Sequence, residues 1–366
     1  RSRRSRNAVL LQYLPQRYQP EFPCSPPGRV AARADLGRTR REASRGKERS
    51  ALIVPQGRRH RLGGEISAGV ISDHLATIGV ASQTEAMPLN TGDSIFLGHA
   101  ANRYGDVPVR LGSADRLLHL YVIGQTGTGK STLLGNLARQ DAAAGRGFCL
   151  IDPHGDLAAE LAETLDRPVR YWNVADPAGR YGYNPLTPVT AEYRPLLASG
   201  LIYTLKRQWS DAWGARMEHL LRYAILALLE YGRADLRDIV RLYVEKDFRR
   251  TVVGRVTDEQ VYAFWTREFP NMNYQNAADG VAPIANKLGA FLANPVLRRA
   301  LSEPAEPLRF RSIMDAGDVL IVNLGKGRLG SDIANVMGGL IVSSIMHAAF
   351  SRHDQPTSER RPFFLY

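Results

Sequence analysis

Cysteine is scarce in this chain of 366 residues, which contains only Cys24 and Cys149. Two cysteines cannot build a disulfide framework, so the composition excludes a disulfide-stapled secreted domain and is typical of a reducing compartment. Long apolar runs are also missing. The longest, residues 336–350, falls short of the roughly 18 residues of a membrane span and contains His347, so we predict a buried helix there and no membrane span. No secretory signal is visible, and the chain begins with Arg1 rather than methionine, so we expect a fragment.

Acidic residues are scarce in the first sixth of the chain. Residues 1–61 hold sixteen Arg and Lys residues against four Asp and Glu residues, which accounts for the whole net charge of +12. The remaining residues carry 32 charges of each sign and are neutral overall. Because residues 1–61 are also rich in Pro, Ser and Gly and lack sustained periodicity, we predict a disordered Arg-rich arm. Such an arm either holds nucleic-acid phosphates by counterion release or is a solvated tail.

The rest of the sequence divides by its hydrophobic periodicity. Residues 62–92 are weakly patterned and predict a linker. Residues 93–190 alternate strand and helix patterns, which is typical of a parallel sheet flanked by helices. Residues 191–302 show apolar side chains at helical spacing and predict an all-helical insertion. Residues 303–366 return to strand and helix patterns and stop within a strand, so we expect the second part of the sheet domain to be incomplete.

Four segments lie around the most informative turn, and the last two adjoin it directly. Residues 94–98 and 107–111 are β-like runs separated by turn residues, which predicts a hairpin. Residues 118–123 have the apolar composition of a buried strand. Residues 131–144 predict a helix, and a glycine-rich turn joins it to that strand.

This turn carries the strongest functional signal. Residues 124–131 read GQTGTGKS and match the pattern G-x-x-x-x-G-K-[ST] in full. The glycines allow successive backbone N–H groups to point at phosphate oxygens, and the positive end of the following helix dipole favours the same anion. Lys130 would reach the β- and γ-phosphates, and the Ser131 hydroxyl would ligate Mg²⁺. We therefore predict an ATP and Mg²⁺ site made by Gly124, Gln125, Thr126, Gly127, Thr128, Gly129, Lys130, Ser131 and Thr132.

Hydrolysis needs groups beyond this phosphate-binding loop. An acidic residue at the end of a neighbouring strand usually holds the Mg²⁺ shell, and another group orients the attacking water. Asp152 follows the apolar run 148–151 and is the candidate. A supporting role near the phosphates and a turn or helix-cap role both stay open for Asp152, and His154 in the same loop has no visible partner. The other catalytic residues are unknown.

Several later segments accompany this loop in a characteristic order. They are HLYVIGQTGTGKSTLL (119–134), LIDPHGDLA (150–158), YNPL (183–186), WGARMEHLLRYAILALLE (213–230), ANKLGAFLANPVLR (285–298) and IMDAGDVLIVNLGKGRLG (313–330). Together they resemble the ATPase domain of TraG/TraD-like conjugative coupling proteins of type IV secretion systems, which belong to the HerA/FtsK superfamily of P-loop motors. The resemblance covers about residues 94–366 and leaves residues 1–90 uncovered.

The resemblance implies a RecA/HerA-FtsK-like α/β fold, with a parallel sheet and an inserted all-helical subdomain. It also implies a ring-forming, usually hexameric, ATP-driven pump that contacts DNA through the ring, with the arm 1–61 as a further contact. Type IV secretion components would be partners, and the location would be cytoplasmic, at the inner face of the membrane through those partners. In the family, a Walker B strand ends in Asp-Glu. Residues 363–366 match the start of that strand, and the acidic pair is not in this chain.

Three interpretations therefore stay open. The chain is a fragment of a DNA-translocating ATPase, or of a related ATPase that energises protein secretion, or it is a nucleotide-binding module that does not hydrolyse ATP. Whether it is an active enzyme depends on the missing acidic residues.

Overall fold

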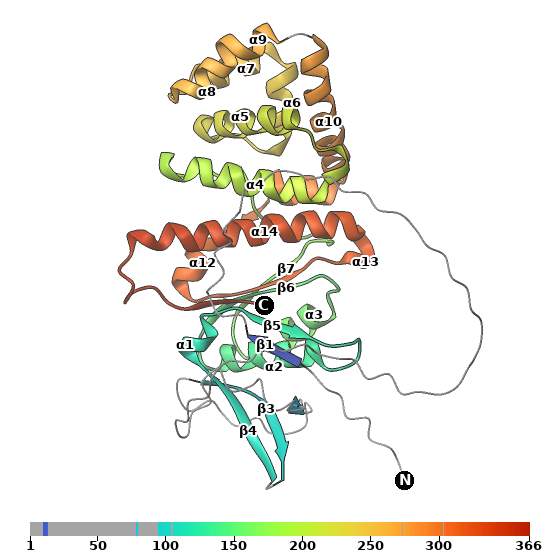
Figure 1. Cartoon of the computed structure of the whole chain (residues 1–366), viewed down its shortest axis with the longest axis vertical. Coiled ribbons are helices and arrows are strands. Elements are labelled where there is room, and N and C mark those ends of the chain that lie inside the picture. Colours follow the sequence, from blue (N-terminus) through green and yellow to red (C-terminus); the bar gives the residue numbers. More distant parts are fainter. Residues whose placement is uncertain (1–9, 14–77, 80–93, 104, 273, 303) are drawn as a thin grey trace, which may run out of the picture. The chain divides into compact units, whose positions relative to one another are not determined.

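The computed structural model describes residues 10–13, 78–79, 94–103, 105–272, 274–302 and 304–366 (Figure 1). The chain divides into two compact units, Arg1–Lys130 and Ser131–Tyr366. The strands are β1 (Leu10–Tyr13), β2 (Ile78–Gly79), β3 (Ser94–Asn102), β4 (Gly105–Gly112), β5 (Leu120–Ile123), β6 (Gly147–Asp152), β7 (Val169–Asn173), β8 (Tyr181–Gly182), β9 (Glu306–Pro307), β10 (Val319–Asn323) and β11 (Phe363–Leu365). The helices are α1 (Ser113–Arg116), α2 (Lys130–Ala143), α3 (Asp156–Thr164), α4 (Arg194–Gln208), α5 (Ala215–Tyr231), α6 (Leu236–Val244), α7 (Lys246–Val253), α8 (Glu259–Ala263), α9 (Phe269–Asn271), α10 (Tyr274–Ala293), α11 (Pro295–Ser302), α12 (Phe310–Ala316), α13 (Lys326–Leu329) and α14 (Ser331–Ser351).

An antiparallel hairpin lies in the described part of the first unit. β3 pairs with β4 along its whole length, with an irregularity between Phe96 and Gly98, and β2 pairs with β3. The predicted hairpin is confirmed, and both strands extend further toward the turn than the sequence pattern indicated.

The strand before the glycine-rich loop has an unexpected partner. β5 pairs antiparallel with β1 over all four residues of each strand. The prediction of a disordered arm is therefore wrong for β1, while the other residues of 1–61, and those of the linker 62–92 except β2, lie outside the described residues. The predicted burial of β5 is wrong for alternate side chains, because Tyr121 and Ile123 are 59% and 38% exposed. Successive side chains of a strand point to opposite faces. When only one face of the strand pair is covered, the side chains on the other face stay exposed to solvent.

A parallel sheet forms the base of the second unit. Its strand order is β11-β6-β10-β7, and all three neighbouring pairs are parallel. β6 reads GFCLID and β10 reads VLIVN. Continuous apolar strands of this kind suit a parallel sheet that is buried on both faces, so the predicted α/β class with a parallel sheet is confirmed.

The side chains of these strands alternate between two cores. Phe148 and Leu150 of β6 pack with Val319 and Ile321 of β10, and with α2 and α3, on one face. Cys149 belongs to the larger core on the other face, which includes α12 and α14 (Figure 1). Burial raises the pKa of the Cys149 thiol, so the thiol stays protonated and serves as a small core side chain.

The connections of the sheet create a switch point between β6 and β10. The chain runs from β6 through α3 to β7, and from β10 through α14 to β11. These two neighbouring strands therefore send their connections toward opposite edges of the sheet. In open parallel sheets, ligands bind outside the carboxyl ends of the strands at such a point.

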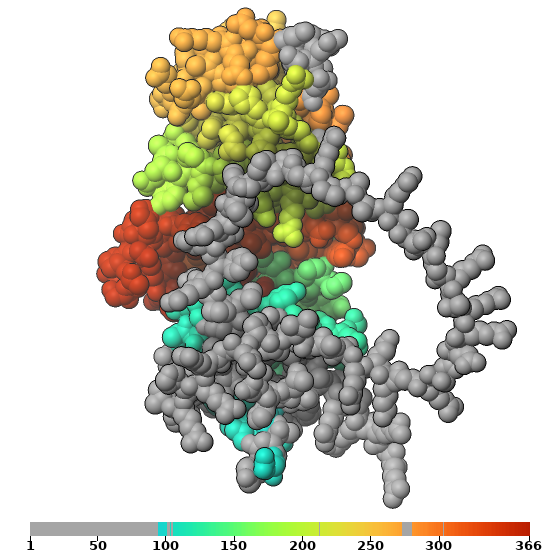
Figure 2. Space-filling view, viewed as in Figure 1, coloured from blue at the N-terminus to red at the C-terminus, as the bar shows by residue number. Residues whose placement is uncertain are grey.

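Helices α4–α11 form an all-helical insertion between β7 and β10. Its two ends are held together by β8 and β9, which pair in parallel. α4 packs on α14 on one side and on α5 on the other, so the insertion stacks directly on the sheet domain. Figure 2 shows this succession as continuous packing from the red α14 through the green α4 to the orange helices. The predicted inserted helical subdomain is confirmed, and its boundaries at residues 191 and 302 stay predictions.

Among the residues that the structure describes, one helix is long and apolar enough to cross a membrane by length and composition alone, namely residues 331–354. This helix is longer than the apolar run 336–350, because it also includes more polar residues on both sides of that run. In the structure, a third of its most apolar window is buried inside the second unit. Met337 and Ile341 face the core, whereas Met346 and Phe350 are 45% and 52% exposed, so the predicted burial holds for one face of the helix only.

Candidate nucleotide-binding site

The predicted phosphate-binding loop has the backbone curl that its glycines allow. Gly127 and Gly129 adopt φ angles of +81° and +91°, a region that side-chain-bearing residues rarely occupy. A Cβ on Gly124 would lie 2.4 Å from the Thr128 hydroxyl oxygen, so the start of the loop is also closed to larger residues. The loop leads directly into α2, whose first turn carries Lys130, Ser131 and Thr132 and holds no acidic residue.

The loop is held together by its own side chains. The Thr128 hydroxyl donates to the Gln125 carbonyl oxygen at 2.8 Å. The Lys130 ammonium donates to the carbonyl oxygens of Gly124 and Gln125, each at 2.8 Å. These contacts place the lysine charge over the loop that would receive a phosphate. Ser131 is exposed and Thr132 is half-buried, and no cluster of metal-ligating side chains occurs among the described residues.

Asp152 lies at the carboxyl end of β6 and is engaged by backbone donors. Its two carboxylate oxygens accept hydrogen bonds from the backbone N–H groups of His154 at 2.9 Å and Ala158 at 3.1 Å. This contact supports the turn and helix-cap role, because both oxygens hold the loop and the first turn of α3. His154 is exposed in this loop.

Two asparagines that the sequence analysis missed lie in the same row as Asp152. Asn323 of β10 is in register with Asp152 on one side and with Asn173 of β7 on the other. The Asn323 side chain accepts from the Gly325 N–H at 2.9 Å and donates to the Tyr171 hydroxyl at 3.0 Å and the Gly155 carbonyl at 3.3 Å. The available signal was that Asn323 ends the apolar strand run VLIV, which places it at the ligand-binding edge of a parallel sheet, whereas the strand before Asn173 contains Arg170 and gave no such signal.

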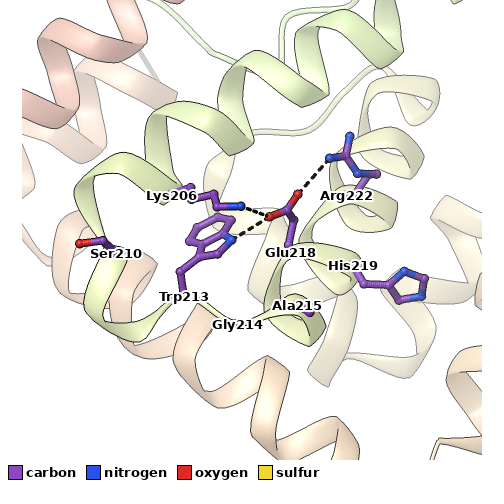
Figure 3. Close-up of a pocket in the computed structure, with 8 residues that line it drawn as sticks. All are labelled: Lys206, Ser210, Trp213, Gly214, Ala215, Glu218, His219 and Arg222. Atoms are coloured by element: carbon purple, nitrogen blue, oxygen red, sulfur yellow. Dashed lines mark hydrogen bonds and ion pairs between the residues drawn. The ribbon is translucent and has the colours of Figure 1, made fainter. Parts of the chain in front are cut away.

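A separate surface pocket of about 590 Å³ lies in the helical insertion, where α4 and α5 meet. Figure 3 shows its centre, in which three donors converge on Glu218. The Trp213 indole N–H donates at 2.9 Å, the Lys206 ammonium at 3.0 Å, and the Arg222 guanidinium at 3.3 Å. The carboxylate joins Lys206 of α4 to Trp213 and to Arg222 of α5, so this network acts as a clamp between the two helices.

The Glu218 clamp predicts a dependence of stability on pH. The Trp213 and Lys206 hydrogen bonds, in that order, lower the pKa of Glu218. Such a carboxylate stabilises the fold fully above the ordinary glutamate pKa of 4.5, and this stabilisation is lost as the pH falls through the lowered pKa. Glu218→Gln should cost about 1 kcal/mol at neutral pH, because a neutral acceptor holds the donors less strongly.

Urea unfolding of wild type and Glu218→Gln at pH 7 and near pH 3 measures this dependence, and the difference in unfolding free energy should shrink at the lower pH. A difference of the same size at both pH values would contradict it.

The parallel sheet, its helical insertion and the glycine-rich loop define an α/β P-loop nucleoside triphosphatase domain. The chain belongs to the family described as "Helicase HerA, central domain", whose model matches residues 95–327. No curated protein matches the chain.

Solved structures of the conjugative coupling protein TrwB are similar to this chain. The unbound monoclinic form of the bacterial TrwBdeltaN70 is 18% identical, with a TM-score of 0.42, over 66% of this chain and 53% of that chain. TrwB with the GTP analogue GDPNP is 19% identical with a TM-score of 0.44, and TrwB with ADP and Mg²⁺ is 19% identical with a TM-score of 0.42; each match covers 66% of this chain and 54% of the other. The match therefore spans about half the length of these relatives.

Proposed function

We propose that this chain is the ATP-binding motor domain of a DNA-translocating ATPase of the conjugative coupling type. The observation that carries the proposal is the complete phosphate-binding loop, residues 124–131, with two left-handed glycines and a helix that continues from it. Membership of the HerA family supports the same conclusion. TrwB, which is similar to this chain, is described in complex with nucleotide analogues and with ADP and Mg²⁺.

The loop residues fit a nucleoside triphosphate. Backbone N–H groups of the curled loop would hold the phosphate oxygens, and Lys130, which already lies over the loop carbonyls, would transfer its hydrogen bonds to the β- and γ-phosphates. The Ser131 hydroxyl would ligate Mg²⁺, which neutralises charge on the transferred phosphoryl group. Because the first turn of α2 holds no acidic residue, no carboxylate opposes the anion there.

The wider assignment follows from the family. We propose that residues 93–190 and 303–366 form the ATPase core, that residues 191–302 are its helical insertion, and that the complete protein forms a ring that moves DNA. The positive charge of residues 1–61 supports a nucleic-acid substrate, since a basic arm binds phosphates without regard to sequence. Type IV secretion components are the proposed partners, and the proposed location is the cytoplasm at the inner face of the membrane.

Lys130→Ala tests the nucleotide site. The variant removes the lysine charge placed over the loop, so we expect Mg²⁺–ATP to bind at least about tenfold more weakly, or about 1.4 kcal/mol. Calorimetric titration of the full chain measures the affinity. The matched control is Lys246→Ala, which removes an exposed lysine at the first position of α7 and should leave ATP affinity unchanged. Equal affinities for wild type and Lys130→Ala would overturn the assignment.

A further inference from the structure

The segment that follows β10 presents two unpaired cations at the switch point of the sheet. It reads LGKGRLG over residues 324–330 and includes α13. Lys326 is half-buried and Arg328 is exposed. In the part of the chain that the structure describes, neither side chain makes a hydrogen bond or an ion pair, and Asp332 in the first turn of α14 forms no ion pair with Arg328.

This segment, residues 324–330, is rigidly held although its cations are free. Leu324 is 3% exposed, and its backbone N–H donates to the Asp152 carbonyl at 3.0 Å. The Lys326 N–H donates to the Pro153 carbonyl at 3.0 Å, and the Arg328 N–H donates to the Gly325 carbonyl at 2.7 Å. Leu329 packs against the larger core. Because the segment is held through its own backbone atoms and its leucines, and not through Lys326 or Arg328, the two charged side chains are left for a ligand.

The surroundings of this segment suit an extended anion. A Cβ placed on Gly327 or on Gly330 would meet nothing within 4 Å, so the backbone between and after the two cations is open. The backbone of Asp152 pairs with this segment, and its carboxylate is occupied by two backbone N–H groups. Small ligands favour concave pockets that enclose them, whereas a nucleic-acid backbone tracks over open basic surface. α13 lies at the start of α14 in Figure 1, beside the loops that end β6 and β7.

We propose that residues 324–330 are a nucleic-acid contact, in which Lys326 and Arg328 bind backbone phosphates without reading the base sequence. This inference rests on the proposed function, since it takes DNA as the substrate. It adds a contact in the second unit to the contribution expected from the Arg-rich arm. Phosphate contacts by Lys and Arg give affinity that falls with salt, and they position a nucleic acid without selecting its sequence.

Lysine acetylation measured by mass spectrometry tests the contact in the full chain. The lysines report separate regions. Lys47 reports the arm, Lys130 the nucleotide loop, Lys246 an exposed control position and Lys326 the proposed contact. The remaining lysines of the chain are Lys206 and Lys287. An oligothymidylate should slow the acetylation of Lys326 several-fold and leave Lys246 unchanged. Mg²⁺–ATP alone should protect Lys130 and leave Lys326 reactive.

The outcomes separate this inference from the proposed function. If Mg²⁺–ATP does not slow the acetylation of Lys130, that result would count against the nucleotide site only. Unchanged Lys326 reactivity with saturating oligothymidylate, whether or not Lys47 is protected, would overturn the contact. Protection of Lys326 by ATP alone, as strong as that by the oligonucleotide, would also overturn it, because the phosphate would then come from nucleotide.

A paired variant supplies a second readout. In Lys326→Gln/Arg328→Gln, the slope of log affinity against log salt for oligothymidylate should become less steep by about 1.4, or about 0.7 for each lost phosphate contact. The control Arg233→Gln/Lys246→Gln removes one exposed arginine and one exposed lysine elsewhere and should keep the wild-type slope. Equal slopes for the two variants, with both proteins folded by circular dichroism, would overturn the contact.

Discussion

Asp141→Ala is expected to lower the free energy of unfolding by about 3–5 kcal/mol, as breaking a buried ion pair does. The Asp141 side chain is completely buried in α2. One carboxylate oxygen accepts from the Arg146 guanidinium at 2.7 Å, and the other accepts from the Tyr366 hydroxyl at 2.5 Å. The variant would leave both donors without this acceptor, and the Arg146 Nη2 atom already has no partner in the described structure.

Urea unfolding with a double-mutant cycle measures the contribution of Asp141. Tyr366→Phe removes one donor only and should cost about 1–2 kcal/mol, and the double variant should cost less than the sum of the two single variants because they share one hydrogen bond. Glu163→Ala is the matched control, since Glu163 is an exposed acid on α3 and its loss should stay within about 0.5 kcal/mol. A cost for Asp141→Ala as small as that of the control would contradict the buried pair.

Gly155→Ala is expected to cost about 2–5 kcal/mol, the second large effect, because two penalties add: left-handed backbone strain and overpacking. Gly155 has a φ of +101° at the turn between β6 and α3. A Cβ there would lie 2.4 Å from the Asn323 side-chain oxygen. Asn323 cannot easily move away, since its amide is held by Gly325 and Tyr171.

Gly145→Ala is the matched control for this effect. Gly145 has a φ of +69°, and an added Cβ would meet nothing within 4 Å, so only the backbone strain of about 1–2 kcal/mol applies. The excess cost of Gly155→Ala in urea unfolding therefore reports the contact with Asn323. Asn323→Ala in the Gly155→Ala background should recover part of that excess. Equal losses of unfolding free energy for Gly155→Ala and Gly145→Ala would contradict the close packing of Gly155 against Asn323.

The row of residues at the carboxyl ends of β6, β10 and β7 supports the turn and helix-cap role of Asp152. Its oxygens are bound by the loop that follows, and the neighbouring positions in register are amides rather than acids. These side chains instead brace the two loops at the switch point. One of those loops begins the segment with Lys326 and Arg328, so the same bracing holds the proposed DNA contact in place.

The glycine-rich loop shows how much of the site is decided locally. The pattern of residues 124–131 predicts the φ angles of Gly127 and Gly129 and the start of α2, because these depend on backbone sterics and on neighbours a few residues away. The contacts of the Lys130 ammonium with its own loop could not be read from the pattern. They depend on which side chains reach the loop carbonyls in three dimensions.

Local periodicity and composition determined the α/β class, the parallel character of the sheet, the helical insertion and the nucleotide-binding loop, since each depends on short-range spacing of apolar residues or glycines. Tertiary structure alone decided the register that aligns Asp152, Asn323 and Asn173, the pairing of β1 with β5, and the burial of Asp141 against Tyr366. These contacts join residues far apart in the chain. Their formation depends on packing and on backbone hydrogen bonds between strands, for which a single sequence carries no local signal.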